Sequence, residues 1–253
     1  MFNKQHIFYM IISFSLTILG LILSRIFIKK YSHKKTLLKI FAILTVCIHF
    51  SSLYVDFFTY GYAKIESPMI LPIYPCNVLM WLLVICAFLK NDNSKIAKHL
   101  YEFTFYGGVI CGIIGIVLNE NFASNPTLLN WFSIKGLLSH STMVFGSAFI
   151  LVGKFIKINV SNCISVFLGL CLFLVDGYII NGLYYIFGLN PCNSMYLLSS
   201  PLPQITWFNT YTMGLIGLAL VFVITNIVEF FTLQKDERFL NITYTKIFKL
   251  NIK

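Results

Sequence analysis

Seven long stretches of apolar residues, separated by short polar segments, run along the chain. They lie at residues 7–28, 37–58, 72–89, 101–118, 134–153, 160–187 and 206–231. A helix needs about 20 apolar residues to cross a bilayer core about 30 Å thick. The pattern therefore predicts an all-α, polytopic membrane protein: a seven-transmembrane-helix bundle over residues 1–231, followed by a short basic tail at 232–253.

The composition agrees with this prediction. Of the 253 residues, 58% are hydrophobic and 11% are charged, whereas soluble domains contain about 25% charged residues. Most of the seven cysteines stand singly in apolar runs, as small core residues do, which argues against a disulfide framework. The first apolar run is too long for a signal peptide and lacks a small-residue cleavage site, so we expect it to be retained as a span.

The net charge of +10 raises the question of nucleic-acid binding, but its distribution favours membrane topology. Most of the 19 Lys and Arg residues flank the first, third and fifth connections or lie in the tail. They are Arg25, Lys29, Lys30, Lys34, Lys35, Lys39, Lys90, Lys95, Lys98, Lys154, Lys157, Lys235, Arg238, Lys246, Lys249 and Lys253. Basic residues concentrate on the cytoplasmic side, which predicts an outside N-terminus, a cytoplasmic C-terminus and no nucleic-acid partner.

Candidate chemistry begins where the third apolar stretch starts, at Pro75–Cys76–Asn77. Proline is favoured at the first position of a helix, and this would place Cys76 at the second. The partial positive charge and unpaired N–H groups of a helix start favour a thiolate. We therefore expect Cys76 to be a nucleophile, although a single cysteine in an apolar run is more often an inert core residue.

Other polar residues are expected at a similar depth, in the outer leaflet. The predicted topology places His140, His49, Asp176 and Asn181 in the outer halves of their spans, with Asn193 just beyond. Intramembrane polar residues usually face the protein interior or a wet cavity. His140 is the candidate base for Cys76, and the supporting or orienting candidates are Asn77, His49, Asp176, Asn181 and Asn193.

Each of these residues also has a purely structural interpretation. An intramembrane histidine can tie two helices together, Asp176 can pair with a tyrosine, and Asn181 can cap a bent helix end. The glycines of the fourth stretch, Gly107, Gly108, Gly112 and Gly115, indicate close helix packing. No short ligand spacing predicts a metal site, and no cofactor is expected.

The chain resembles the YwaF-like integral membrane proteins, a group that includes a eukaryotic ether-phospholipid acyltransferase. The matching pieces are Leu71–Pro72, Pro75–Cys76–Asn77, Gly107–Gly108, Ser139–His140, Asn181, Asn193–Leu197 and Ser200–Pro201. Ser194 stands where that pattern has tyrosine, and Pro191–Cys192 is additional. The resemblance implies a seven-helix fold and an acyl-transfer centre at Cys76 and His140.

The leading functional hypothesis is therefore a multi-pass acyltransferase of the cell membrane, with its site near the outer leaflet. A phospholipid would donate the acyl group to Cys76, and a lysophospholipid or a lipoprotein would accept it. The alternative is a non-catalytic transporter or ligand-binding membrane protein, since broken helices and midspan polar residues also build carrier sites. A seven-helix receptor or scaffold is a third possibility, which the short tail disfavours.

Overall fold

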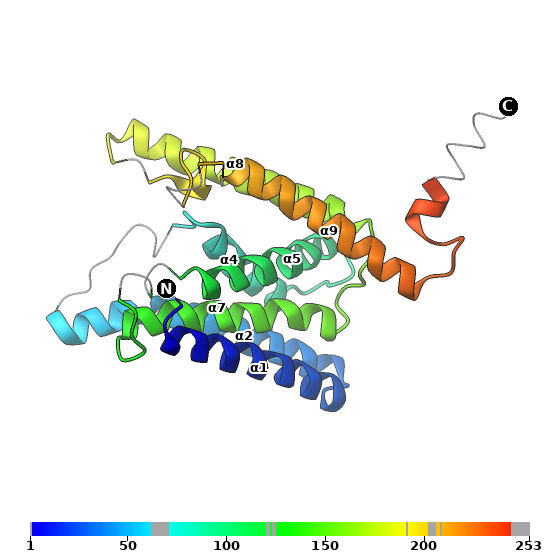
Figure 1. Ribbon diagram of the computed structural model, residues 1–253, viewed down its shortest axis with the longest axis horizontal. Coiled ribbons are helices and arrows are strands. Elements are labelled where there is room, and N and C mark those ends of the chain that lie inside the picture. The colour runs from blue at the N-terminus through cyan, green and yellow to red at the C-terminus, as the bar shows by residue number, and fades with distance from the viewer. Residues whose placement is uncertain are drawn as a thin grey trace.

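The computed structural model describes residues 2–61, 71–119, 122, 125–190, 192–201, 206–207 and 209–243. These residues fold into long helices that lie roughly side by side (Figure 1), and no strand occurs among them. Four residues that the sequence analysis named lie outside the described residues: Pro191, Lys246, Lys249 and Lys253. The expectation of an all-α protein is confirmed for the part of the chain that is described.

Each of the seven predicted stretches contains one long helix. The helices are α1 (Lys4–Phe27), α2 (Tyr31–Tyr60), α4 (Pro75–Phe88), α5 (Lys95–Val117), α7 (Trp131–Val152), α8 (Asn162–Ile186) and α9 (Thr210–Thr232), and a short 3-10 turn, η1 (Ser194–Tyr196), precedes α9. Several helices begin before the apolar stretch does. The reason is capping: the side chains of Asn3, Ser94 and Asn130 accept hydrogen bonds from the first turns of α1, α5 and α7.

Six of these helices are long and apolar enough to cross a membrane, and α4 is the exception. With 14 residues, α4 is about 21 Å long at 1.5 Å per residue, which is shorter than a bilayer core of about 30 Å. Its residues are nevertheless apolar and largely buried. The structure thus establishes six candidate spans and a short apolar seventh helix inside the bundle.

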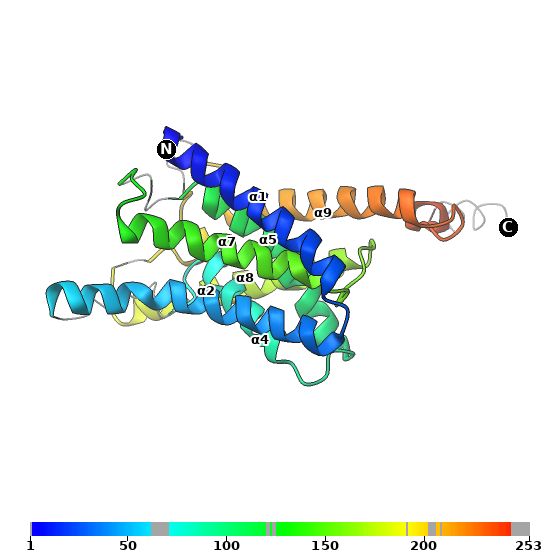
Figure 2. The same ribbon diagram turned by 90° about the horizontal axis from the view of Figure 1, so that it is seen from below.

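The middle of the bundle is formed by α5 and α7, which pack against each other. α7 also contacts α1, α2 and α4, whereas α8 packs on α5, and α9 packs on α8 (Figures 1 and 2). Glycines permit the close approach of α5: Gly108 and Gly112 meet Ser147 and Val144 of α7, and Gly107 meets Leu79 of α4. The predicted packing role of these glycines is confirmed.

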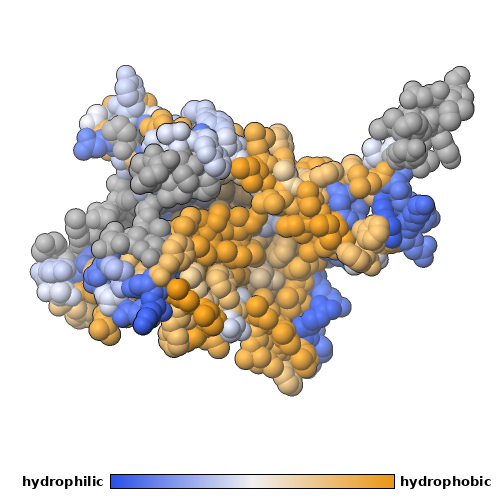
Figure 3. All heavy atoms as spheres, in the orientation of Figure 1, coloured by the Kyte–Doolittle hydropathy of each residue, from blue (hydrophilic) through white to orange (hydrophobic). Residues whose placement is uncertain are grey.

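Hydrophobic and hydrophilic residues are distributed over the surface as a membrane protein requires. Hydrophobic residues cover the middle of the face in Figure 3, and hydrophilic residues gather toward its two ends. The connections α1–α2, α4–α5 and α7–α8 lie at the same end as the last turn of α9 (Figures 1 and 2). Because these connections carry most of the basic residues of the described chain, we call this the basic end.

Candidate functional site

The start of α4 has the geometry that its sequence predicts. Tyr74 precedes a proline and is therefore held in an extended conformation, so the helix begins at Pro75. Cys76 is the second helical residue. The Tyr74 carbonyl accepts hydrogen bonds from the N–H groups of Asn77 and Val78, at 2.9 and 3.3 Å. The thiol of Cys76 thus lies in the first turn of a helix.

The side chain of Asn77 lies next to this thiol. The Cys76 Sγ atom is 3.4 Å from Asn77 Oδ1, and Asn77 Nδ2 donates to the Leu71 carbonyl at 3.5 Å. Asn77 is buried, whereas Cys76 is half-buried. An amide oxygen beside the sulfur can accept a hydrogen bond from the S–H group and thereby orient the thiol.

A second thiol, that of Cys111, lies opposite Cys76. The helices α4 and α5 run in opposite directions and touch where Gly107 meets Leu79; a Cβ atom on Gly107 would lie 2.7 Å from Leu79 Cδ2. One turn away along each helix stand Cys76 and Cys111. Both pack against the same apolar cluster.

His140 is held in one tautomer by its own helix. Its Nδ1 atom is 2.7 Å from the Gly136 carbonyl, and because a carbonyl can only accept, Nδ1 carries the proton. The neutral ring then has a lone pair on Nε2. The Nε2 edge rests on Gly115 of α5, where any Cβ atom would overlap the ring. The base end of the imidazole therefore faces α5, one turn from Cys111.

Cys76 and His140 thus approach the same part of α5 from two different helices. Met143, one turn after His140 on α7, belongs to the apolar cluster that packs against both Cys76 and Cys111. The structure places the predicted nucleophile and the predicted base on neighbouring turns around α5. The assignment of Cys76 and His140 as nucleophile and base stays a prediction.

The short turn η1 joins α8 to the start of α4. Asn181 of α8 accepts a hydrogen bond from the Ser194 N–H at 2.8 Å and donates to the Ser194 carbonyl at 3.2 Å. In turn, the Ile73 carbonyl accepts from Ser194 Oγ at 3.1 Å and from the Met195 N–H at 2.7 Å. Asn181 therefore acts on the site by holding η1 against the residues that start α4.

Asn193 organises the same segment from within. Its Oδ1 accepts from the N–H groups of Leu198 and Ser199, and its Nδ2 donates to Ser199. Asn193, Met195 and Tyr196 all have left-handed backbone angles, with φ of 50°, 53° and 53°. Such angles cost free energy for residues other than glycine and gather at functional sites. In this structure both asparagines hold the loop that supports the thiol.

The last two predicted residues are on α2 and α8. His49 is on α2, and its ring packs edge-on to Phe50, with 5.2 Å between the ring centroids. Asp176 is on α8, one turn after Phe173. Its Oδ2 atom is buried and has no hydrogen-bond partner among the described residues. A buried polar atom in that state requires an explanation, and Asp176 therefore remains a candidate for contact with a bound molecule.

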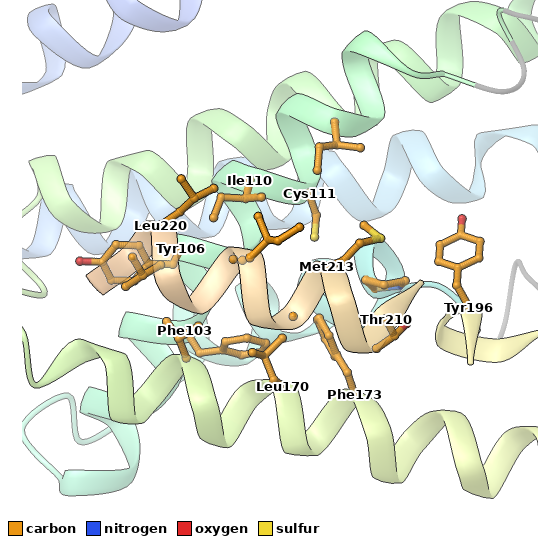
Figure 4. A pocket seen from close by; sticks show the side chains of 18 residues that line it. Phe103, Tyr106, Ile110, Cys111, Leu170, Phe173, Tyr196, Thr210, Met213 and Leu220 are labelled. Carbon is orange, nitrogen blue, oxygen red and sulfur yellow. The ribbon is translucent and has the colours of Figure 1, made fainter. Parts of the chain in front are cut away.

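An apolar cavity of about 190 Å³ opens beside the start of α4. It lies between α5, α8 and α9, where α9 packs on α8 and stands back from α5 (Figure 4). Cys111 points into it opposite Met213, Tyr196 and Thr210 lie toward one end, and Pro75 also belongs to its lining. Its size exceeds that of the engineered cavity, about 150 Å³, that binds benzene in another protein. It can therefore hold a segment of hydrocarbon chain.

In the part of the chain that the structure describes, no three His, Cys, Asp or Glu side chains gather in a way that would hold one ion.

Comparison with protein-family models matches residues 1–226 to the TMEM164 family. The chain belongs to the TMEM164 family. The match covers all the helices except the last residues of α9, and with it both Cys76 and His140. No curated protein matches the chain, and no solved structure does either.

Membership of the TMEM164 family agrees with the expected multi-pass membrane protein. The family differs in name from the YwaF-like proteins, and its description states no activity. The motifs that carried that resemblance nevertheless have defined places in this TMEM164-family chain. Residues 71–77 form the start of α4, Gly107 and Gly108 form helix contacts, and residues 193–197 form η1 and its flanks.

Sequence reasoning missed two parts of this site. Cys111 was grouped with the inert core cysteines, because a single cysteine in an apolar helix carries no local signal; only its position opposite Cys76 distinguishes it. The cavity was missed because its lining comes from three helices that are distant in sequence. A partial signal existed in Gly214 and Gly217, which leave space on the α9 face that lines the cavity.

Proposed function

We propose that this protein is a membrane acyltransferase that carries the acyl group as a thioester on Cys76. The donor is a neighbouring phospholipid, and the acceptor is a lysophospholipid or the N-terminal amine of a lipoprotein. The observation that carries the proposal is the apolar cavity, whose lining includes Pro75, the residue before Cys76 in the first turn of α4. A lipid whose acyl chain occupies this cavity would present its ester bond near Cys76.

His140 supports the proposal as the general base. Because its Nδ1 proton is engaged by the Gly136 carbonyl, Nε2 carries the lone pair that would accept the proton of the thiol. A base that is fixed in the correct tautomer needs no reorganisation before proton transfer. Asn77 Oδ1, at 3.4 Å from Sγ, would orient the thiol for this transfer.

The reaction consists of two exchanges of the same acyl group. In the first, the thiol proton moves to His140, Sγ bonds to the ester carbonyl carbon, and the ester C–O bond breaks. The departing lysophospholipid oxygen receives the proton from His140. In the second, a hydroxyl or amine acceptor loses its proton to His140 and attacks the thioester, and Cys76 is released as a thiol.

The direct test follows labelled acyl chains in membranes that contain the full-length protein. Cys76→Ala is expected to abolish transfer, and His140→Ala to slow it by about 10²- to 10⁴-fold, the usual contribution of a general base. Cys47→Ser is the matched control, because Cys47 is an exposed cysteine of α2. Unchanged transfer by Cys76→Ala would exclude the covalent route.

A second test addresses the cavity. Gly217 lines the cavity and has no atom within 4 Å of its Cβ position, and Gly182 of α8 has the same freedom but is not part of the cavity lining. Gly217→Phe should fill the cavity and reduce acyl transfer, whereas Gly182→Phe should not. Equal activities would show that acyl chains bind elsewhere.

A membrane protein that binds lipid without reacting with it is the alternative that the same cavity favours. Mass spectrometry of the protein purified from membranes separates the two, because only the acyltransferase forms an acyl thioester on Cys76. Bound lipid without any thioester, in a protein that also lacks transfer activity, would support the binding protein.

A further inference from the structure

A second pocket, polar and of about 540 Å³, lies at the basic end of the bundle. It is formed by Tyr31, residues 90–93, Lys154 and Phe155, so that it joins the connections α1–α2, α4–α5 and α7–α8. It lies at the opposite end of α4 from Cys76. Nothing in the proposed acyl transfer uses it.

The pocket has an excess of positive charge. Its acidic residue, Asp92, is already engaged: Asp92 Oδ1 accepts from Lys35 Nζ and from the Tyr101 hydroxyl, both at 2.7 Å. Lys35 also donates to the Cys86 carbonyl at 2.9 Å. Neither Lys90 nor Lys154 forms an ion pair among the described residues. The pocket lining therefore contains two lysines that form no ion pair among the described residues, and one carboxylate that is paired with Lys35.

The backbone holds Lys154 at the pocket in an unusual conformation. Its φ angle is +65°, a left-handed value that favours glycine and costs free energy for other residues. The turn is fixed by hydrogen bonds from the N–H groups of Lys154 and Phe155 to the carbonyls of Leu151 and Ile150. The Phe155 ring also packs on Tyr31, with 5.8 Å between centroids. The backbone conformation alone would favour glycine at this position, yet the chain has a lysine there.

We propose that this pocket binds a phosphate anion, supplied by the headgroup of an anionic phospholipid. Two ammonium groups and the nearby Asn91 and Asn93 side chains provide the donors that a phosphate needs. Tyr31 and Phe155 supply the aromatic surface that is typical of the membrane interface. Basic pockets between helices at this depth suit the headgroups of anionic lipids. The site is independent of the acyl-transfer proposal, since it involves neither Cys76 nor the apolar cavity.

The test is native mass spectrometry of the full-length protein in a non-ionic detergent, with phosphatidylglycerol, phosphatidylcholine or inorganic phosphate added. The protein is expected to retain one phosphatidylglycerol in preference to phosphatidylcholine. The double variant Lys90→Ala/Lys154→Ala should weaken that binding about 30-fold, since each lysine near an anionic headgroup contributes about 1 kcal/mol. Lys95→Ala/Lys157→Ala is the control, because it removes the same charge from exposed residues outside the pocket.

The outcomes distinguish the source of the phosphate. Retained phosphatidylglycerol that inorganic phosphate does not displace supports the lipid headgroup. Displacement by inorganic phosphate supports the same anion site with free phosphate as its ligand. Equal weakening by the two double variants, or no preference for the anionic lipid, would overturn the proposal. Matching thermal unfolding midpoints for both variants show that the fold is intact.

Discussion

Single glycine positions decide how closely the candidate base can approach α5. The ring of His140 occupies the space that a side chain at position 115 would need, and Gly136 supplies the carbonyl that fixes its tautomer. The same residue type elsewhere in the chain has no such role: a Cβ atom on Gly182 would meet nothing within 4 Å. The effect of a glycine therefore depends on its neighbour across the helix interface.

This contrast gives a matched pair of substitutions. Gly115→Ala should lower the free energy of unfolding by about 1–3 kcal/mol, because the added methyl group overpacks a filled interface. Gly182→Ala should leave it unchanged or raise it by up to about 1 kcal/mol, because alanine is the better helix former. Thermal unfolding in detergent measures both.

A double variant identifies the cause. If the methyl group at position 115 acts through the imidazole ring, Gly115→Ala/His140→Ala should be less destabilised than the sum of the single variants, because the truncated side chain leaves room. If the destabilisations of the two single variants simply added up in the double variant, the methyl group at position 115 would clash with atoms other than the imidazole ring.

At the scale of elements, the chain uses a short irregular segment to position a helix start. Residues 193–197 connect α8, through Asn181, with the Ile73 carbonyl just before α4. The Met195 carbonyl also accepts a hydrogen bond from Thr210, the first residue of α9. Three helices therefore meet at η1, and the position of Cys76 depends on all of them.

Removing the amide of Asn181 tests this linkage. Asn181→Ala should destabilise the protein by about 1–3 kcal/mol, since it leaves the buried backbone groups of Ser194 without their partners. Hydrogen exchange of residues 193–199 should become faster. Asn226→Ala is the control, because half-buried Asn226 donates its side-chain hydrogen bond within its own helix, to the Phe222 carbonyl. Equal hydrogen-exchange rates of residues 193–199 in the two variants would contradict the linkage of this segment to α8 through Asn181.

The packing of α4 against α5 gives a second prediction at this scale. Because the Leu79–Gly107 contact places Cys76 opposite Cys111 one turn away, the reagent dibromobimane, which links two neighbouring thiols, should join these cysteines. Fluorescence of the linked product and peptide mapping measure the reaction. Cys111→Ser should abolish it and Cys171→Ser should not. A dibromobimane cross-link from Cys76 to any other cysteine would require α4 and α5 to pack in a different register.

For the molecule as a whole, the open question is whether α4 crosses the membrane. Six helices satisfy the length and composition of a span, and the 14 residues of α4 do not. Its placement inside the bundle, against α2, α5 and α7, permits a short helix to complete a crossing, because its ends are surrounded by protein instead of lipid. We expect seven crossings, with the basic end in the cytoplasm.

Cysteine labelling in whole cells tests this topology. In a chain whose native cysteines are replaced by serine, Leu129→Cys should react with a membrane-impermeant maleimide, because Leu129 is exposed in the α5–α7 connection. Asn91→Cys and Lys235→Cys, at the basic end, should react only after permeabilisation. Labelling of Asn91→Cys in intact cells would mean that α4 does not cross.

The sequence alone determined the elements. Apolar length and the positions of Pro75, Ser94 and Asn130 specify where helices form and begin, because helix formation and capping are local properties. The same local signals placed Cys76 at a helix start. The basic connections were also predictable, since each depends only on neighbouring residues.

Only the tertiary structure decided which residues form the site. The placement of Cys111 opposite Cys76, the support of His140 by Gly115 and the cavity between α5, α8 and α9 all depend on contacts between helices distant in the chain. In apolar helices nearly every residue is compatible with burial, so hydrophobicity does not specify which faces meet. Steric fit between small and large side chains decides that, and it exists only once the helices are packed.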